Sequence, residues 1–376
     1  MTRKPETIPA NPFDRQWAAI GPDVLEAVER VGASGSYVLG QEVAGFEQAF
    51  AEQSSVAHAV GCGSGLDAIE IGLRALGIAP GDRVLTTPLS AFATALAIIR
   101  AGGVPCFVDV DDSGLLDLDE AEKRLTDDSG IRFMLPVHLF GHALDLEHLA
   151  ELRDRFQLRI LEDAAQAVLA RSNGRAVGSV GQATAVSFYP TKNLGALGDG
   201  GCVLTDDRRV ADDCRAIRDY GQSDKYVHDR LGMNSRLDEL HAAVLRTALL
   251  PRLSDWTAQR RQIAAQYLRG LADAPVDIPP TPERSESVWH LFPVLAREGN
   301  RDGLLEHLRS NGIQAGIHYP RLIDEQPALP RDPDRAVGGL ANARRFRTDE
   351  VSLPIHPYLR DDDIDRVIAL VREWKR

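Results

Sequence analysis

The sequence predicts an α/β protein with a large, mostly parallel sheet domain followed by a smaller α+β domain. Two observations support this. Short apolar runs alternate with longer segments of helical period through the first two thirds of the chain, and the pattern changes after a long amphipathic segment. With 376 residues, 44% of them hydrophobic, the chain can build more than one core. We place the large domain at residues 1–250 and the small domain at residues 251–376.

Six short apolar runs are expected to be buried strands of the large sheet. Helical periodicity between them is clearest in residues 66–78 and 146–156. Because strands that alternate with helices form parallel sheets, most of these strands should run parallel. The runs are residues 82–87, 104–110, 131–138, 158–164, 183–189 and 200–206.

A long amphipathic segment, residues 237–271, is interrupted by Pro251 and should connect the two domains. The segments that follow it, residues 288–296, 303–313 and 362–374, read as one strand and two helices of a small α+β unit.

Composition excludes several classes of protein. The net charge of −12 argues against binding to nucleic acid, because phosphates attract a surplus of Lys and Arg. No segment approaches the ~18 apolar residues of a membrane span, and the first residues lack the apolar run of a signal peptide. We therefore expect a cytoplasmic protein.

Cysteine and histidine spacing gives no sign of a metal centre. His138 and His142 in "HLFGH" have no third ligand nearby, so we expect no metal. The four cysteines lack CxxC spacing and lie in or beside apolar segments, which favours reduced core thiols. They are Cys62, Cys106, Cys202 and Cys214.

The first chemical feature is the glycine-rich stretch "VGCGSGLDAIEIGLRALGI", residues 60–78. Its apolar positions from Leu66 onward form one helical face, so the glycines precede a helix N-terminus, where backbone N–H groups suit a phosphate. Leu66 stands where the dinucleotide pattern G-x-G-x-x-G needs its last glycine. A turn without a ligand remains an alternative.

Two further features follow in the chain. Glu162 and Asp163 end an apolar strand, which is where open α/β sheets bind ligands, although a surface or capping role is also open. Lys192 follows the next strand in "SFYPTKNLGALGDGG", residues 187–201, amid closely spaced glycines. A phosphate turn, a strand-end carboxylate and a strand-end lysine together describe a pyridoxal phosphate site, with Lys192 as the covalent anchor.

The segments "EDAAQA", "SFYPTKNLGALGDGG", "GMNSRLDELHAAVLR", "LPVHLFG" and "SLPIHPYL" resemble the DegT/StrS family of sugar aminotransferases, and the resemblance runs from residue 34 to the C-terminus. It implies the fold type I aminotransferase architecture and a homodimer with active sites at the subunit interface. The helix after Asn234 fits an interface, since its apolar positions need burial. These positions are Leu237, Leu240, Val244 and Leu245.

The resemblance also implies roles for individual residues. Lys192 and Asp163 match the catalytic lysine and the carboxylate that holds the proton on the pyridine nitrogen. Gln166 would lie by the ring hydroxyl. The phosphate would be bound by the backbone amides of Gly65 and Leu66, by Ser187, and by Asn234 from the partner subunit.

Three positions depart from the family pattern. An aromatic residue commonly stacks on the pyridine ring, but Ala91 stands there and Phe92 follows it, so Phe92 is our candidate. Leu66 replaces a frequent Thr and leaves only its amide for the phosphate. Val168 and Leu169 replace the usual His-Gly, which predicts altered packing near Gln166.

The implied reaction moves an amino group from an amino acid, with glutamate expected, to a ketone of a nucleotide-linked sugar, while the cofactor cycles through pyridoxamine phosphate. Residues 218–239 most resemble the branch that acts on dTDP-3-keto-6-deoxyhexoses, where the loop around Tyr220, Lys225 and Tyr226 approaches the substrate. His318 and Tyr319 match a segment near the substrate pocket. A 4-keto sugar or a keto-cyclitol is the alternative.

Two other classes of function stay open. A nicotinamide-dependent sugar dehydrogenase could use the glycine-rich turn, but it would leave Lys192 and Asp163 without a purpose. A catalytically silent regulator that binds the cofactor is the second. The retained lysine disfavours the dehydrase variants of the family, which have His at this position.

Overall fold

The large sheet has seven strands in the order β1-β9-β8-β5-β4-β2-β3 in the computed structural model, which describes residues 6–329 and 339–375. Strand β9 runs antiparallel to both neighbours, and the pairs from β8 to β3 are parallel, so the predicted mostly parallel sheet is confirmed. The strands are β1 (His58–Cys62), β2 (Arg83–Thr86), β3 (Val104–Phe107), β4 (Phe133–Met134), β5 (Arg159–Asp163), β8 (Ala183–Ser187) and β9 (Gly201–Thr205).

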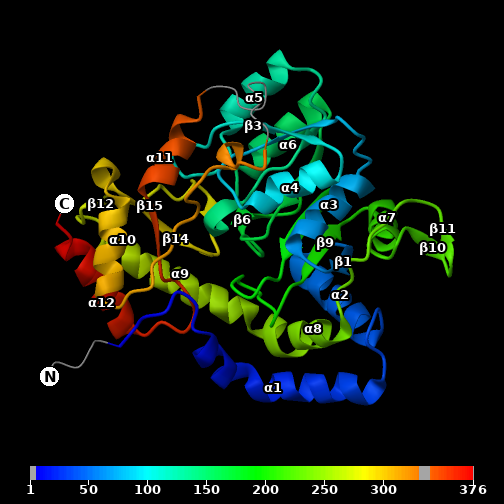
Figure 1. Cartoon of the computed structure of the whole chain (residues 1–376), viewed down its shortest axis with the longest axis horizontal. Coiled ribbons are helices and arrows are strands. Elements are labelled where there is room, and N and C mark those ends of the chain that lie inside the picture. The colour runs from blue at the N-terminus through cyan, green and yellow to red at the C-terminus, as the bar shows by residue number, and fades with distance from the viewer. Residues whose placement is uncertain (1–5, 330–338, 376) are drawn as a thin grey trace.

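Helices cover both faces of this sheet (Figure 1). Side chains alternate along each strand, so apolar side chains point to both faces and have to be covered on each. In β8, Ala185 packs toward α3 (Gly65–Ala75), α4 (Phe92–Arg100) and α7 (Arg208–Arg218). The next residue, Val186, packs toward the opposite face. That face is covered by α1 (Phe13–Ser34), α2 (Gln41–Ser54) and α8 (Glu239–Val244), and, in a neighbouring core, by α5 (Leu118–Asp127) and α6 (Leu146–Phe156).

The strands and helices expected in the large domain occur, but each strand is shorter than the apolar run that predicted it. The run at residues 131–138 contains only the two-residue strand β4, while the expected helix at 146–156 has the bounds of α6. Helices α1 and α2 were not predicted. Residues Ile20, Val24, Ala27 and Val31 are buried at helical spacing along α1, although Pro22, a residue that usually interrupts helices, lies within it.

The amphipathic segment at 237–271 breaks at its proline. Helix α8 continues into a π-helical turn (Leu245–Leu249) and a 3₁₀ turn (Leu250–Arg252) before α9 (Leu253–Gly270) begins. Leu237, Val244 and Leu245 are buried within one chain, whereas Leu240 is 40% exposed there, and its burial at a subunit interface stays a prediction.

The C-terminal part contains an antiparallel sheet in the order β12-β14-β15, formed by Val276–Asp277, Phe292–Ala296 and Glu350–Leu353. It is packed by α9, α10 (Arg301–Ser310) and α12 (Asp361–Glu373), while α11 (Ala341–Asp349) lies beside the large part (Figure 1). The N-terminal segment also reaches this core, since Ile8 pairs with Ile313. The division at residue 250 stays a prediction.

Two smaller sheets also occur in the described part of the chain. The first, in the order β13-β6-β7, joins Ser285–Glu286 to Arg171–Ser172 and Arg175–Ala176. The second is the hairpin of β10 (Gln222–Asp224) and β11 (Val227–His228). All four cysteines are buried and free, as expected. Among the described residues, no helix combines the length and apolarity that crossing a bilayer would require.

Candidate active site

Two adjacent carboxylates end strand β5, and strand alternation sends them to opposite sides. Glu162 is fully buried, accepts backbone N–H groups of Gly178, Val180 and Gly181 at 2.6–2.9 Å, and contacts His138 Nε2 at 2.9 Å. Burial alone would raise the pKa of Glu162, but His138 and these N–H groups hold it below its usual value. Glu162 therefore anchors the loop after β7.

Asp163 faces the other way and is 5% exposed. Its Oδ1 accepts the Ala165 N–H at 3.0 Å, and the Thr94 hydroxyl also hydrogen-bonds to it. Burial raises the pKa of Asp163, while the Ala165 N–H and the charge of Lys192 oppose that rise. Thr94 on α4 was missed in the sequence analysis, although a buried hydroxyl in the otherwise apolar "FATALAII" is a signal.

Lys192 lies in the turn that follows β8, where its backbone N–H donates to the Tyr189 carbonyl at 2.8 Å. Burial lowers the pKa of Lys192 to about 8, and the Asp163 carboxylate partly opposes this. The structure therefore brings the two predicted catalytic residues within electrostatic reach of each other. A lysine poised near neutral pH suits proton transfer.

Close backbone approaches explain two of the glycines behind Lys192. A Cβ on Gly195 would lie 2.3 Å from the Pro190 carbonyl oxygen, and one on Gly201 would lie 2.2 Å from the Ser64 carbonyl oxygen. Only glycine leaves that space free. The second contact holds the start of β9 against the N-terminus of α3.

The N-terminus of α3 meets the end of β8. Ser64 caps the helix by accepting the Asp67 N–H at 3.1 Å, and a Cβ on Gly65 would lie 2.5 Å from the Ser187 Cβ. The first-turn N–H groups of Gly65 and Leu66 have no acceptor within the helix. Three of the predicted phosphate-binding groups are thus neighbours, at the positive end of the helix dipole.

The loop that carries Asn234 reaches the same helix. Ser235 Oγ accepts the Gly63 N–H at 2.9 Å and donates to Asp67 Oδ2 at 2.8 Å. Asn234 itself is exposed. Its assignment to the phosphate of the partner subunit stays a prediction.

Gln166 and Tyr319 come together from segments 153 residues apart. Gln166 Oε1 accepts the Phe140 N–H at 2.8 Å, and its Nε2 donates to the Tyr319 hydroxyl at 3.2 Å. Burial raises the pKa of Tyr319, with the Asp163 carboxylate adding to the rise. His318 precedes Tyr319 and interacts electrostatically with Lys192. Both predicted substrate residues of this segment therefore lie beside the candidate catalytic pair.

Phe92 begins α4 and packs against an apolar cluster that includes Phe107 and Ile323. Ala91 precedes it at the start of the helix. Because Thr94, two residues on, points toward Asp163, Phe92 projects from a different side of the helix. Stacking of Phe92 on a cofactor ring stays a prediction.

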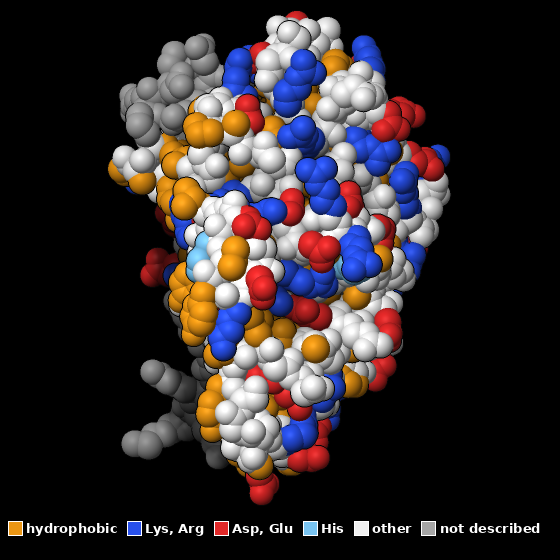
Figure 2. Space-filling view, turned by 90° about the vertical axis from the view of Figure 1, so that its right-hand side faces the viewer, with side chains coloured by type: hydrophobic (Ala, Val, Ile, Leu, Met, Phe, Trp, Pro, Cys, Tyr) orange, Lys and Arg blue, Asp and Glu red, His pale blue; other side chains and the backbone are white. Residues whose placement is uncertain are grey.

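The remaining predicted substrate residues lie apart from Lys192 within one chain. Tyr220 is 48% exposed and lies 5.3 Å from the Arg236 guanidinium, while Lys225 lies over the ring of Tyr226. The hairpin β10–β11 projects beyond α7 (Figure 1), and hydrophobic side chains gather along one edge of this side amid mixed charges (Figure 2). Leu231, in the same loop, is 86% exposed.

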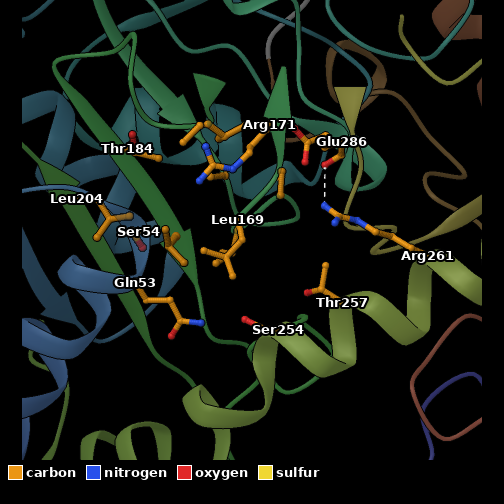
Figure 3. A pocket seen from close by; sticks show the side chains of 16 residues that line it. Gln53, Ser54, Leu169, Arg171, Thr184, Leu204, Ser254, Thr257, Arg261 and Glu286 are labelled. Carbon is orange, nitrogen blue, oxygen red and sulfur yellow. Dashed lines mark hydrogen bonds between the residues drawn. The ribbon is translucent and has the colours of Figure 1, made fainter. Parts of the chain in front are cut away.

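A cavity of about 280 Å³ lies behind the segment that carries Gln166, between α9 and the sheet (Figure 3). Val168 and Leu169 line it, so these two departures from the family pattern face away from Gln166. Arg261 at its edge donates to the Glu286 carbonyl at 3.3 Å. The lining contains neither Lys192 nor Asp163, so this cavity is separate from the candidate catalytic pair.

The arrangement fits pyridoxal phosphate in the chemistry of its donors. The close approach of Gly65 to Ser187 forms a small cradle at a helix N-terminus, which suits a dianion. A buried carboxylate at Asp163 suits a protonated ring nitrogen, and a lysine of lowered pKa suits a carbonyl carbon.

Comparison with known proteins finds transaminases and aminotransferases among the similar chains. The chain is 45% identical over 350 residues to the dTDP-3-amino-3,4,6-trideoxy-alpha-D-glucose transaminase of Streptomyces venezuelae, covering 93% of this chain and 91% of that protein. It is 38% identical over 370 residues to the pleiotropic regulatory protein of Geobacillus stearothermophilus, covering 98% and 99%.

The structural comparison covers nearly the whole chain. The crystal structure of S. venezuelae DesV in complex with a ketimine intermediate matches with a TM-score of 0.92 and 41% identity, covering 98% of this chain and 99% of that one. The profile of one family of aminotransferases matches residues 18–372. The chain therefore belongs to the DegT/DnrJ/EryC1/StrS aminotransferase family.

Proposed function

We propose that this protein is a pyridoxal phosphate-dependent aminotransferase that moves an amino group from glutamate to a dTDP-3-keto-6-deoxyhexose. The observation that carries the proposal is the pairing of buried Asp163 with Lys192 beside the α3 N-terminus. The substrate class rests on the 45% identity to the S. venezuelae transaminase. A 4-keto sugar or a keto-cyclitol is the alternative substrate.

Each candidate residue has a task in this reaction. Gly65, Leu66 and Ser187 would bind the phosphate, Asp163 the ring nitrogen, and Lys192 the carbonyl carbon. Pyridoxal phosphate, when bound, supplies an electron-withdrawing ring that makes the carbon bearing the amino group acidic. Thr94 and the Ala165 N–H would hold the Asp163 carboxylate in place as the ring is bound.

Lys192 would move the proton in both halves of the reaction. Burial lowers its pKa to about 8, so at neutral pH a larger fraction of its amine is unprotonated than for an exposed lysine. In the first half Nζ would take a proton from the donor carbon and pass it to the carbonyl carbon of the cofactor. In the second half it would take a proton from that carbon and pass it to the sugar carbon that gains the amine.

We also propose a cytoplasmic homodimer in which the projecting hairpin completes the site of the partner. Support comes from exposed apolar side chains that one chain leaves uncovered, among them Tyr226 at 82% and Leu231 at 86%. A second apolar region is exposed in one chain. It is a cavity of about 380 Å³ next to the Lys192 loop, and Phe13, Trp17 and Leu197 are among the residues that line it.

A second candidate function has one observation in its favour. The relative from G. stearothermophilus is named a pleiotropic regulatory protein. A catalytically silent regulator would bind the cofactor but would not transfer an amino group to any sugar.

The deciding experiment incubates purified protein with pyridoxal phosphate, glutamate and either 3-keto or 4-keto dTDP sugars, and identifies the products by mass. We expect the aminated 3-keto sugar to accumulate, with none from the Lys192→Ala variant. Amination of the 4-keto sugar alone would replace the proposed substrate. Cofactor binding without amination of any sugar would favour the regulator.

A further inference from the structure

Three side chains form a continuous hydrogen-bonded chain that ends beside Lys192. His318 Nδ1 contacts Ser352 Oγ at 2.8 Å, and Ser352 Oγ in turn contacts Glu350 Oε1. The other carboxyl oxygen, Oε2, accepts the His318 backbone N–H at 2.6 Å. Glu350 is fully buried and Ser352 is 4% exposed, so water has little access to the chain.

Packing of two segments holds these groups together. Gly316 and Ser352 exchange backbone hydrogen bonds of 3.0 and 3.1 Å, which fixes the segment of His318 against β15. His318 also lines a cavity of about 110 Å³ with His290, Arg260 and Thr191. The reaction proposed above uses neither Glu350 nor Ser352.

A hydroxyl between a carboxyl group and an imidazole permits two directions of donation. When Glu350 is ionised, Ser352 donates to Glu350 and accepts from Nδ1–H, which leaves His318 Nε2 as an acceptor. When Glu350 is neutral, its O–H donates to Ser352, Ser352 donates to Nδ1, and His318 Nε2 carries the proton.

The environment of Glu350 places the change between these two hydrogen-bonding arrangements near neutral pH. Burial raises the pKa of Glu350 to about 8, opposed by the His318 N–H, Ser352 and the charge of Arg301 on α10. Burial and the charge of Lys192 lower the pKa of His318 to about 4, so its ring stays neutral. His290 is held neutral as well, because burial and Lys192 lower its pKa. Two neighbours of His318 also titrate: Tyr319 stays protonated because burial raises its pKa, whereas burial lowers the pKa of Lys192 to about 8.

We propose that Ser352 and Glu350 are positioning residues which set, by the protonation state of Glu350, whether His318 Nε2 donates or accepts a hydrogen bond in the active site. The proton balance is closed. One proton enters at Nε2, Nδ1 passes its proton to Ser352, Ser352 passes its own to Glu350, and the imidazole remains neutral. The role in substrate binding rests on the proposed function, whereas the switch itself does not.

The test of the switch needs neither cofactor nor substrate. Protein labelled with ¹⁵N-histidine is prepared without cofactor, and the His318 signals are assigned by their loss in His318→Asn. We expect Nδ1 and Nε2 to exchange protonated and unprotonated signatures as pH rises through about 8. His356 is the internal control: its Nε2 donates to the Pro9 carbonyl, which only accepts, so its tautomer should not change.

Three variants distinguish the switch from a structural role. Glu350→Gln keeps the shape, and its amide donates to Ser352, so His318 should carry the Nε2 proton at every pH. Ser352→Ala breaks the chain and should abolish the pH dependence, while Ser352→Thr retains the hydroxyl and should restore it. An unchanged transition in Ser352→Ala, or none in the parent protein, would overturn the proposal.

Kinetics then connects the switch to the reaction. For the keto sugar that is aminated, kcat/KM of the parent should change with the same ionisation. Glu350→Gln should remove this ionisation from the pH profile. On the alkaline side, kcat/KM of the two proteins should differ by about tenfold. A tautomer switch in a protein that aminates no sugar would leave the switch standing and refute the proposed function. Amination with the same ionisation in Glu350→Gln as in the parent would exclude the link between switch and substrate.

Discussion

At the scale of single residues, position along a strand decides which carboxylate does chemistry. Glu162 and Asp163 are neighbours in sequence and both buried, but one is bound by three backbone N–H groups and the other faces Lys192. The roles assigned to Asp163 and Lys192 stay predictions, and substitutions test them directly.

Lys192→Ala should abolish amination, because it deletes both the covalent anchor and the group that moves the proton. Glutamate-dependent amination of the sugar measures the loss, and circular dichroism checks that the fold persists. Normal amination by this variant would show that another residue is the catalytic lysine.

Asp163→Asn should slow amination by about two orders of magnitude or more, because a neutral amide does not hold the proton on the ring nitrogen. Single-turnover rates with glutamate, read from the cofactor absorbance, measure this. Glu162→Gln is the matched comparison and should act through stability, since Glu162 anchors a loop. Equal turnover of Asp163→Asn and the parent would refute the role of Asp163.

Glu350 should make stability depend on pH. Its pKa is raised in the folded state to about 8, so the folded protein retains a proton that the unfolded chain releases, and stability falls as pH rises from the usual carboxyl range through about 8. Glu350→Gln lacks this dependence. Between pH 5 and pH 9, the Tm of Glu350→Gln should therefore rise relative to that of the parent. The corresponding change in the free energy of unfolding is on the order of a few kcal/mol. A constant difference across this range would contradict the prediction.

At the scale of elements, the junction between α3 and β8 depends on missing side chains. Gly65→Ala should push the helix N-terminus away from Ser187, because the added Cβ would lie 2.5 Å from the Ser187 Cβ. We expect loss of cofactor affinity and a lower Tm, measured by cofactor titration and thermal unfolding. Gly32→Ala in α1 is the control: no atom lies within 4 Å of its added Cβ, so it should stabilise the protein by about 0.5–1 kcal/mol. Equal behaviour of the two variants would show that the junction tolerates a side chain.

At the scale of the whole molecule, the proposed dimer shares its active sites. Lys192→Ala and Asn234→Asp, which places a negative charge against the phosphate, should each be inactive alone. If Asn234 serves the partner's site, heterodimers carry one site with both defects and one with neither. Mixing after subunit exchange should then restore up to about half of the activity per heterodimer, by two-fold symmetry. No recovery despite demonstrated exchange would place Asn234 in its own chain's site or outside any site.

Much of the architecture could be predicted because it depends on local pattern. Alternating apolar runs and helical periods indicated the large sheet, and the fold type I architecture implied by the resemblance is confirmed by the structural match to DesV. The order of strands was not predicted, nor was the reversed direction of β9, because neither depends on residues adjacent in the sequence. Leu240 is exposed within one chain, and an apolar residue by itself does not specify which surface covers it.

Local sequence patterns are enough to identify the chemistry that the chain carries: a lysine and a carboxylate at strand ends, a glycine-rich helix start, and motifs of the family. The groups that tune this chemistry become visible only in the folded chain. Folding brings Thr94 to Asp163, Tyr319 to Gln166, and Glu350 through Ser352 to His318. The physical reason is range: strand and helix periods act over a few residues, whereas a buried polar group takes its partner from whatever segment packing places against it.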